Sequence, residues 1–212
     1  MRRYKVPAYD ETTGKGLVRH VYVRVNRKGE SLCCVVINGR QAPREPELAA
    51  YVCAAVPHTA GVLVNSNTRR GNVILGERYR TLWGRDYLMD TLCGLEFKLS
   101  VPSFYQVNRD QAEILYGKAL DYAGMTGRET VLDLYCGIGT ITLCLAKQAG
   151  RVIGAEIVPA AIADAEENAA RNHIENAEFF CGDAAEVAGR LEAGGLRPAG
   201  VTVAPPRKGV AP

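Results

Sequence analysis

The sequence predicts an α/β fold, in which an incomplete doubly wound sheet of about four parallel strands follows a small α+β subdomain. Residues 1–92 consist of short alternating or apolar runs separated by turns, whereas strand-like and helix-like segments alternate regularly from about residue 107. Repeated β-α-β units with short connections imply a parallel sheet covered by helices on both faces. We therefore expect two domains, residues 1–92 and residues 93–212.

The first domain is expected to contain a hairpin, one helix and further strands. His20–Val25 alternates, a turn follows at residues 26–29, and Leu32–Ile37 is apolar and β-branched, as in paired strands. Helical spacing of apolar residues predicts a helix over Pro46–Val56. The other strand-like segments are Val62–Asn65 and Asn72–Leu75, and Glu96–Leu99 follows just after this domain.

The second domain shows a stricter alternation. Asn108 can cap a helix because Gln111 lies three positions later, and the apolar stripe of this helix is expected at Ala112, Leu115, Ala119 and Tyr122. The predicted strands are Thr130–Leu134, Val152–Ala155, Ala177–Cys181 and Val201–Val203. The predicted helices between them are Thr140–Gln148, Pro159–Arg171 and Ala184–Leu191.

Composition excludes several classes of protein. The chain has 47% hydrophobic and 23% charged residues, which is ordinary for a globular protein, and no apolar run approaches the ~20 residues of a membrane span. The basic N-terminus leads to Pro7, Asp10 and Glu11 instead of an apolar stretch, so we expect no secretory signal and a cytoplasmic location. The seven cysteines form no C-x-x-C pair, which favours buried reduced thiols over disulfides or a metal site.

Charge is distributed unevenly between the two halves. Residues 1–92 hold 15 Lys or Arg against 8 Asp or Glu, and residues 93–212 hold 11 against 15. A basic half favours a polyanionic partner such as RNA, although a solvated surface explains the same excess.

A glycine turn follows the strand at Thr130–Leu134. Gly137 and Gly139 allow the backbone to approach a ligand closely, and the helix that starts at Thr140 presents free N–H groups. A tight turn without a ligand is the alternative interpretation. Thr142 stands where a dinucleotide fingerprint has its third glycine, which disfavours a nicotinamide-dependent oxidoreductase.

Acidic residues at the ends of successive strands indicate the ligand. Asp133 precedes the glycines, Glu156 closes the next strand, and Asp183 follows the third. Ligands bind at the carboxyl ends of such strands. We expect an S-adenosylmethionine pocket, in which Glu156 accepts the ribose hydroxyls and Asp183 the adenine amino group. Each carboxylate could instead cap a helix or face water.

Several segments together resemble the RNA 5-methyluridine methyltransferases, which use S-adenosyl-L-methionine to methylate uracil C5 in tRNA or 23S rRNA. The segments are Lys98–Asn108, Asp133–Thr140, Asp164–Asn172 and Pro205–Gly209. Arg3–Glu11, Leu17–His20 and Asn72–Gly76 also resemble the bacterial rRNA members of this family. The resemblance implies a Rossmann-like methyltransferase sheet, and 23S rRNA as the expected substrate.

The resemblance also implies roles for individual residues. Phe104 would stack on an extruded uracil, although Phe104 and Tyr105 also fit ordinary core aromatics. Arg207 would contact the substrate. The cofactor site implied by strand ends and resemblance together comprises Gln106, Asp133, Tyr135, Gly137, Gly139, Thr140, Glu156 and Asp183.

The sequence departs from the family pattern in two respects. Family members add a cysteine thiolate from a Ser-Cys-Asn-Pro motif to uracil C6, and a later carboxylate acts as the base; neither is present in the 212 residues. Cys136 and Cys181 do not match that nucleophile. Ala204 stands where the family has Asp, which removes a partner for the uracil edge. We therefore expect a chain that binds the cofactor but is catalytically incomplete.

Two further alternatives stay open. The chain could be a non-catalytic RNA-binding module that holds phosphates with nine basic residues of the first domain: Arg2, Arg3, Arg24, Arg27, Lys28, Arg69, Arg70, Arg78 and Arg80. A nicotinamide-dependent oxidoreductase is less favoured. An exposed strand at the sheet edge also favours pairing with a second copy of the chain as a homodimer.

Overall fold

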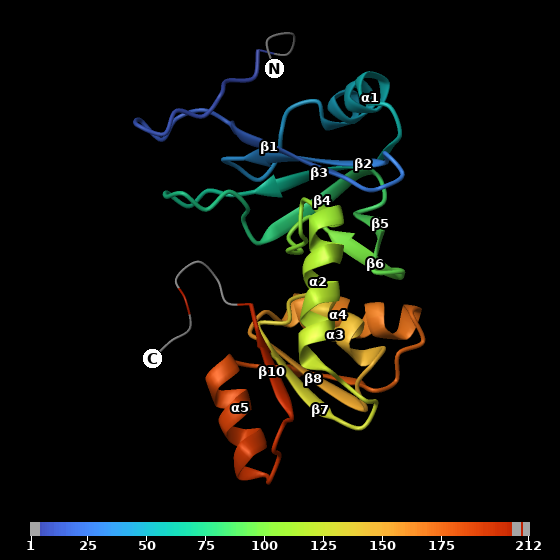
Figure 1. Cartoon of the computed structure of the whole chain (residues 1–212). Coiled ribbons are helices and arrows are strands. Elements are labelled where there is room, and N and C mark those ends of the chain that lie inside the picture. Colours follow the sequence, from blue (N-terminus) through green and yellow to red (C-terminus); the bar gives the residue numbers. More distant parts are fainter. Residues whose placement is uncertain (1–4, 205–208, 210–212) are drawn as a thin grey trace. The chain divides into compact units, whose positions relative to one another are not determined.

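The computed structural model describes residues 5–204 and Gly209, and the chain divides into two compact units (Figure 1). The first unit comprises Met1–Asp90 with Ser100–Pro102, and the second comprises Thr91–Leu99 with Ser103–Pro212. Each unit has its own sheet and is described by itself.

The first unit is built on a four-stranded mixed sheet. Its strands are β1 (Val18–Val25), β2 (Ser31–Ile37), β3 (Thr59–Ser66) and β4 (Arg78–Gly84), in the spatial order β1-β2-β3-β4. The outer pairs are antiparallel and β2 pairs parallel to β3, with helix α1 (Glu45–Ala55) in the crossover. Every residue of β2 is buried, because one hydrophobic cluster forms around Val35 and Ile37 and another around Leu32 and Cys34.

The prediction of a strand at Asn72–Leu75 is wrong. This segment is an irregular loop between β3 and β4, and its carbonyls accept hydrogen bonds from the side chain of Asn67 instead of from a neighbouring strand. Beyond this loop, the sequence prediction missed β4 and β5 (Tyr87–Leu92). No residue of β4 is fully buried, so this strand lacks a clear apolar alternation. β5 pairs with β6 (Leu95–Ser100) in a two-stranded sheet, and the turn between them places Cys93 and Gly94 in the left-handed region.

The second unit contains the predicted parallel sheet. Its strands are β7 (Thr130–Leu134), β8 (Arg151–Glu156), β9 (Ala177–Cys181) and β10 (Gly200–Val203), in the order β10-β7-β8-β9, and every pair is parallel. Helices α2 (Arg109–Ala123), α3 (Thr140–Ala146) and α4 (Pro159–Arg171) lie to one side of the sheet, and α5 (Ala184–Ala193) lies to the other (Figure 1). The α/β prediction is confirmed, with bounds shifted by a few residues.

Helix α2 begins as predicted, because the side chain of Asn108 accepts a hydrogen bond from the backbone N–H of Gln111. Its predicted apolar stripe is correct at Ala112 but wrong at Leu115 and Tyr122, which are exposed. The second buried residue is Tyr116, four positions after Ala112. Apolar residues occupy both sides of this helix, and the hydroxyl of Tyr116, 3.2 Å from Thr140 Oγ1, fixes the side that faces α3.

All seven cysteines carry free thiols. Within the described ranges, no three His, Cys, Asp or Glu side chains gather as a metal site would require. The helices of the same ranges are too short or too polar to cross a bilayer.

Glu45 at the start of α1 links this helix to β4. Its carboxylate accepts hydrogen bonds from the guanidinium of Arg80 and from the backbone N–H of Ala42, and the side chain is buried. Neighbouring Glu47 pairs with Arg44 at the exposed surface.

Replacing Glu45 with Ala should lower the free energy of unfolding by about 1–3 kcal/mol, because Arg80 and the Ala42 N–H lose their acceptor while partly buried. Thermal unfolding of Glu45→Ala and Glu47→Ala measures the contrast. The Glu47 variant should change little, since exposed ion pairs contribute little. Equal destabilisation by the two substitutions would contradict this assignment.

Candidate functional site

The site is organised by the loop Tyr135–Gly139, which connects β7 to α3. Tyr135, Gly137 and Gly139 all adopt the left-handed region, with φ of 66°, 56° and 82°. A tyrosine in this region is strained, since its Cβ crowds the backbone, and such strain is concentrated at functional sites. The backbone N–H of Cys136 donates to the carbonyl of Ala155 at 3.0 Å, so the loop is held against the end of β8.

The two glycines of this loop are required for different reasons. A Cβ at Gly139 would lie 3.2 Å from the ring of Phe179 and 3.3 Å from Ala165, so this glycine allows close packing of α3, β9 and α4. A Cβ at Gly137 would meet nothing within 4 Å. Gly137 therefore borders open space, and its backbone is accessible to a ligand.

Glu156, the last residue of β8, is anchored at both carboxylate oxygens. Oε2 accepts from the N–H of Gly137 at 3.1 Å, and Oε1 accepts from the N–H of Val158 at 3.0 Å. Each carboxylate oxygen has a second lone pair. The orientation of Glu156 is thus fixed by backbone donors, and the carboxylate can still accept hydrogen bonds from a ligand.

Asp183 follows β9 and caps helix α5. Its Oδ1 accepts from the N–H groups of Ala185 and Glu186 at 2.9 and 3.3 Å. The sequence left open that Asp183 caps a helix instead of binding a ligand, and the structure shows that it does cap α5. The cap uses Oδ1 alone, which leaves Oδ2 available on the same side chain.

Asp133 lies behind the loop. Its side chain is fully buried and accepts a hydrogen bond from Thr142 Oγ1, while Oδ1 finds no hydrogen-bond partner among the described residues. Burial raises the pKa of Asp133 to about 7, and the negative charge of Glu156 adds to the rise. Thr142, at the position of the missing third glycine, thus serves as the donor to this carboxyl group.

A polar stripe on α4 fixes the segment that precedes Phe104. Asn168, which is buried, accepts from the N–H of Lys98 at 2.7 Å and donates to the carbonyl of Ile138 at 3.2 Å. Asn172 exchanges hydrogen bonds with both backbone groups of Glu96, and Asp164 accepts from Ser103 Oγ at 3.1 Å. Asp164, Asn168 and Asn172 are four residues apart and lie on one side of α4. Their hydrogen bonds therefore connect the glycine loop to residues 96–103.

A cavity of about 760 Å³ opens at the carboxyl ends of the four parallel strands. The register aligns Leu134 with Ala155 and with Val203, and Glu156 with Cys181, so the residues after these strand ends converge. The cavity is lined by Phe104, Gln106, Tyr135, Gly137, Ala155, Glu156, Ile157, Asp183, Ala184 and Ala204.

The structure therefore brings together six of the residues predicted for the site: Phe104, Gln106, Tyr135, Gly137, Glu156 and Asp183. Asp133, Gly139 and Thr140 do not line the cavity; they support the loop from behind through buried packing and hydrogen bonds. Arg207 and most of the Pro205–Gly209 segment lie outside the described residues. Ala155, Ile157 and Ala184 also line the cavity, and nothing in the sequence pointed to them because their side chains are apolar.

The aromatic pair Phe104 and Tyr105 is divided between surface and core. Tyr105 is buried, with its ring centroid 6.3 Å from that of Phe97. Phe104 is 74% exposed and lines the cavity, which an ordinary core aromatic would not. Cys136 is buried beside Gly154, and burial raises the pKa of its thiol, so it has the character of a packing residue.

Two other hollows lie along the edge strands β9 and β10. Neither is lined by Glu156, Asp183 or the glycine loop. The first is lined by residues of α4 and β9, and the second by residues of α2 and β10.

Comparison with known proteins agrees with this geometry. Residues 126–193 match the family model described as "Methyltransferase domain". The chain is 43% identical over 209 residues to an uncharacterized RNA methyltransferase of Halalkalibacterium halodurans. The matched region covers 98% of this chain and 46% of that protein. It is equally identical over 210 residues to one of Staphylococcus aureus, covering 99% of this chain and 46% of that protein.

The chain is homologous to RNA methyltransferases. The resemblance to RNA methyltransferases predicted from the sequence is thereby confirmed, and the chain spans about half the length of these relatives.

Solved structures confirm the Rossmann-like methyltransferase fold. The Pyrococcus abyssi tRNA (uracil-54, C5)-methyltransferase, solved with S-adenosyl-L-homocysteine, has a TM-score of 0.69 at 23% identity, covering 86% of this chain and 43% of that one. A SAM-dependent methyltransferase from Agrobacterium tumefaciens has a TM-score of 0.55 at 17% identity, covering 89% and 60%.

The two glycines of the loop should respond differently to substitution. Gly139→Ala should cost about 1–3 kcal/mol in unfolding free energy, because the methyl group meets Phe179 and Ala165 while the backbone is strained. Gly137→Ala should cost less, since only the backbone is strained. Chemical denaturation of both variants measures the difference, and a larger cost at Gly137 would refute the packing role of Gly139.

Asp133 should make stability depend on pH. Its folded pKa of about 7 exceeds the ordinary value of 3.8, so its contribution to stability is fully present below the ordinary pKa and is lost as the pH rises through 7. Asp133→Asn, neutral at every pH, should therefore gain stability relative to wild type between pH 5 and pH 8, by an amount on the order of a few kcal/mol. Unfolding midpoints at both pH values measure this gain.

Asp121→Asn provides the control, because Asp121 is an exposed carboxylate on α2. Its difference from wild type measures the effect of exchanging a carboxylate for an amide at an exposed position. A difference between Asp133→Asn and wild type that stays constant with pH would show that Asp133 does not titrate in this range.

Proposed function

We propose that this chain binds S-adenosyl-L-methionine and an RNA uracil, as part of an enzyme that methylates uracil C5 in 23S rRNA. The observation that carries the proposal is the convergence of Glu156, Asp183 and Gly137 on one cavity at the strand ends. The cavity volume suits a nucleoside with an attached amino acid, since ligand sites commonly enclose about 300–1,000 Å³.

The residues present fit this cofactor. Glu156, already oriented by two backbone N–H groups, has lone pairs for a pair of ribose hydroxyls. Asp183 has Oδ2 for the adenine amino group, and Gly137 leaves room for the methionine end. Gln106 and Tyr135 complete the walls of the cavity. When bound, S-adenosyl-L-methionine supplies an electrophilic methyl group on a sulfonium ion.

The uracil would be held at Phe104. Phe104 presents an exposed ring on which an unstacked base can lie, as enzymes that modify bases require. Ala204 also lines the cavity and offers no side-chain hydrogen bond to the base. We assign no nucleophile in this chain, since neither Cys136, which is buried, nor Cys181, which does not line the cavity, is placed to attack a base there.

The choice of 23S rRNA over tRNA rests on the segments Arg3–Glu11, Leu17–His20 and Asn72–Gly76, which resemble the rRNA members. The basic first domain, residues 1–92, would face this RNA, and the substrate would be met in the cytoplasm. The proposal also includes a homodimer through the edge of β10, supported by exposed Val201 and Val203.

Calorimetric titration with S-adenosyl-L-methionine tests the proposal directly. Wild type should bind it and should not bind NAD. Glu156→Gln should weaken binding roughly 10- to 100-fold, because a hydrogen bond to a charged acceptor contributes about 1.5–3 kcal/mol. Glu178→Gln is the matched control, since Glu178 pairs with Arg151 away from the cavity.

Absence of S-adenosyl-L-methionine binding by folded wild type would overturn the proposal. Equal weakening by Glu156→Gln and Glu178→Gln would remove the assignment of the site to the strand ends. Binding of NAD in its place would favour the oxidoreductase.

A further inference from the structure

The loop between β3 and β4, Asn67–Gly76, is exposed but is held by buried side chains. Surface loops of this length are usually among the more mobile parts of a protein. This loop instead receives hydrogen bonds along its length from three buried polar groups: Arg19, Asn65 and Asn67. The conformation of the loop is therefore fixed by hydrogen bonds from these buried side chains.

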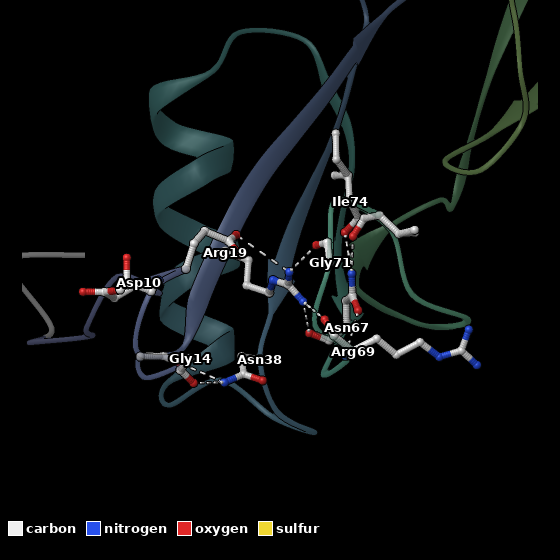
Figure 2. Close-up of polar contacts among 12 residues, drawn as sticks. Asp10, Gly14, Arg19, Asn38, Asn67, Arg69, Gly71 and Ile74 are labelled. Carbon is white, nitrogen blue, oxygen red and sulfur yellow. Dashed lines mark hydrogen bonds and ion pairs between the residues drawn. The ribbon is translucent and has the colours of Figure 1, made fainter. Parts of the chain in front are cut away.

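Arg19 of β1 is the central anchor (Figure 2). Its guanidinium donates to the carbonyls of Asn67, Arg69 and Gly71 at 3.0, 2.7 and 3.3 Å. The side chain is 0% exposed and lies 4.6 Å from the ring centroid of Tyr9, with the Glu11 carboxylate 3.8 Å away. Burying a guanidinium is costly unless it is well bonded, and here its bonds go to loop carbonyls.

The two asparagines fix the second half of the loop. Asn67 donates to the carbonyls of Val73 and Ile74 at 2.7 and 3.0 Å, and it accepts from the N–H of Arg69. Asn65 donates to the carbonyl of Gly76 and accepts its N–H. A Cβ on Gly76 would lie 2.0 Å from the carbonyl oxygen of Ser66. These contacts explain the motif Asn72–Gly76, to which the proposed cofactor site gives no role.

The residues that this scaffold presents are cationic and apolar. Arg69 extends away from Arg19 and Asn67 in Figure 2, and its side chain is 76% exposed even though it pairs with Glu77. Arg70 is exposed, and within the described ranges no carboxylate pairs with it. Val73 is 67% exposed. The buried side chains thus order the exposed residues Arg69, Arg70 and Val73, while Leu75 of the same loop packs against the cluster around Leu32 and Cys34.

We propose that the loop Asn67–Gly76 is a preorganised RNA-contact loop, in which Arg69 and Arg70 bind phosphates and Val73 lies against a base or sugar. The inference deepens the function proposed above and rests on its RNA substrate. RNA fits this chemistry because it offers phosphates and apolar base faces together. A loop already fixed loses little conformational entropy on binding, so its contacts contribute more to affinity.

Binding of a fluorescently labelled uridine-containing RNA hairpin, followed by anisotropy at several salt concentrations, tests the proposal with the full chain. Arg69→Ala/Arg70→Ala should bind about tenfold more weakly, and its salt dependence should become shallower by about 0.7 in log–log slope for each phosphate that is no longer neutralised. Val73→Ser should weaken binding without changing the slope, because it removes no charge.

Arg197→Ala is the matched control. Arg197 is 72% exposed and pairs with Glu192, as Arg69 pairs with Glu77, but it lies after α5 in the second unit. Its RNA affinity should equal that of wild type. Thermal unfolding verifies that every variant is folded, since all these side chains are exposed.

The proposal fails if the double variant binds RNA with the same affinity and the same salt dependence as Arg197→Ala, which is the result expected if the loop contacts a protein instead. It also fails if folded wild type binds no RNA. Titration of the same samples with S-adenosyl-L-methionine separates this failure from failure of the proposed function. The double variant should bind S-adenosyl-L-methionine as wild type does, since neither arginine lines the cavity.

Discussion

The parallel register of β7, β8, β9 and β10 is the constraint on which the rest of the site depends. Because all four strands run in one direction, Tyr135, Glu156, Asp183 and Ala204 emerge at the same edge of the sheet although they are widely separated in sequence. Helices α3 and α5 begin at that edge, so backbone donors accompany the carboxylates. Changing the direction of one strand would remove its residue from the cavity.

The parallel sheet of the second unit was predicted well from the sequence, because each of its elements is marked by residues close together in the chain. A buried strand, a glycine turn and a helix follow one another at Thr130–Ala146, and the acidic residues are close to the strand ends. The sequence did not show that Gly139 is closely packed while Gly137 borders open space, or that Asp133 lies behind the loop. These differences depend on which residues pack against each position. Phe179 and Ala165 occupy the space beside Gly139, and both come from later elements.

The first unit was harder to predict, because buried polar side chains replace regular pairing. Asn72–Leu75 has the composition of a strand, but Asn65 and Asn67 satisfy the backbone groups around it. The same principle holds in the second unit, where Asn168 and Asn172 pair with the backbone of residues 96–98. Such long-range amide contacts leave no periodic pattern, so the sequence alone could not predict the loop geometry that carries them.

Hydrogen–deuterium exchange of the chain with and without S-adenosyl-L-homocysteine tests the central claim most directly, since it reports where the ligand is bound. The convergence of strand ends predicts protection at residues 135–139, 156–158 and 183–186, with no change along the outer edge of β9. Protection confined to other segments, or to one strand end alone, would contradict a single site built by the parallel sheet.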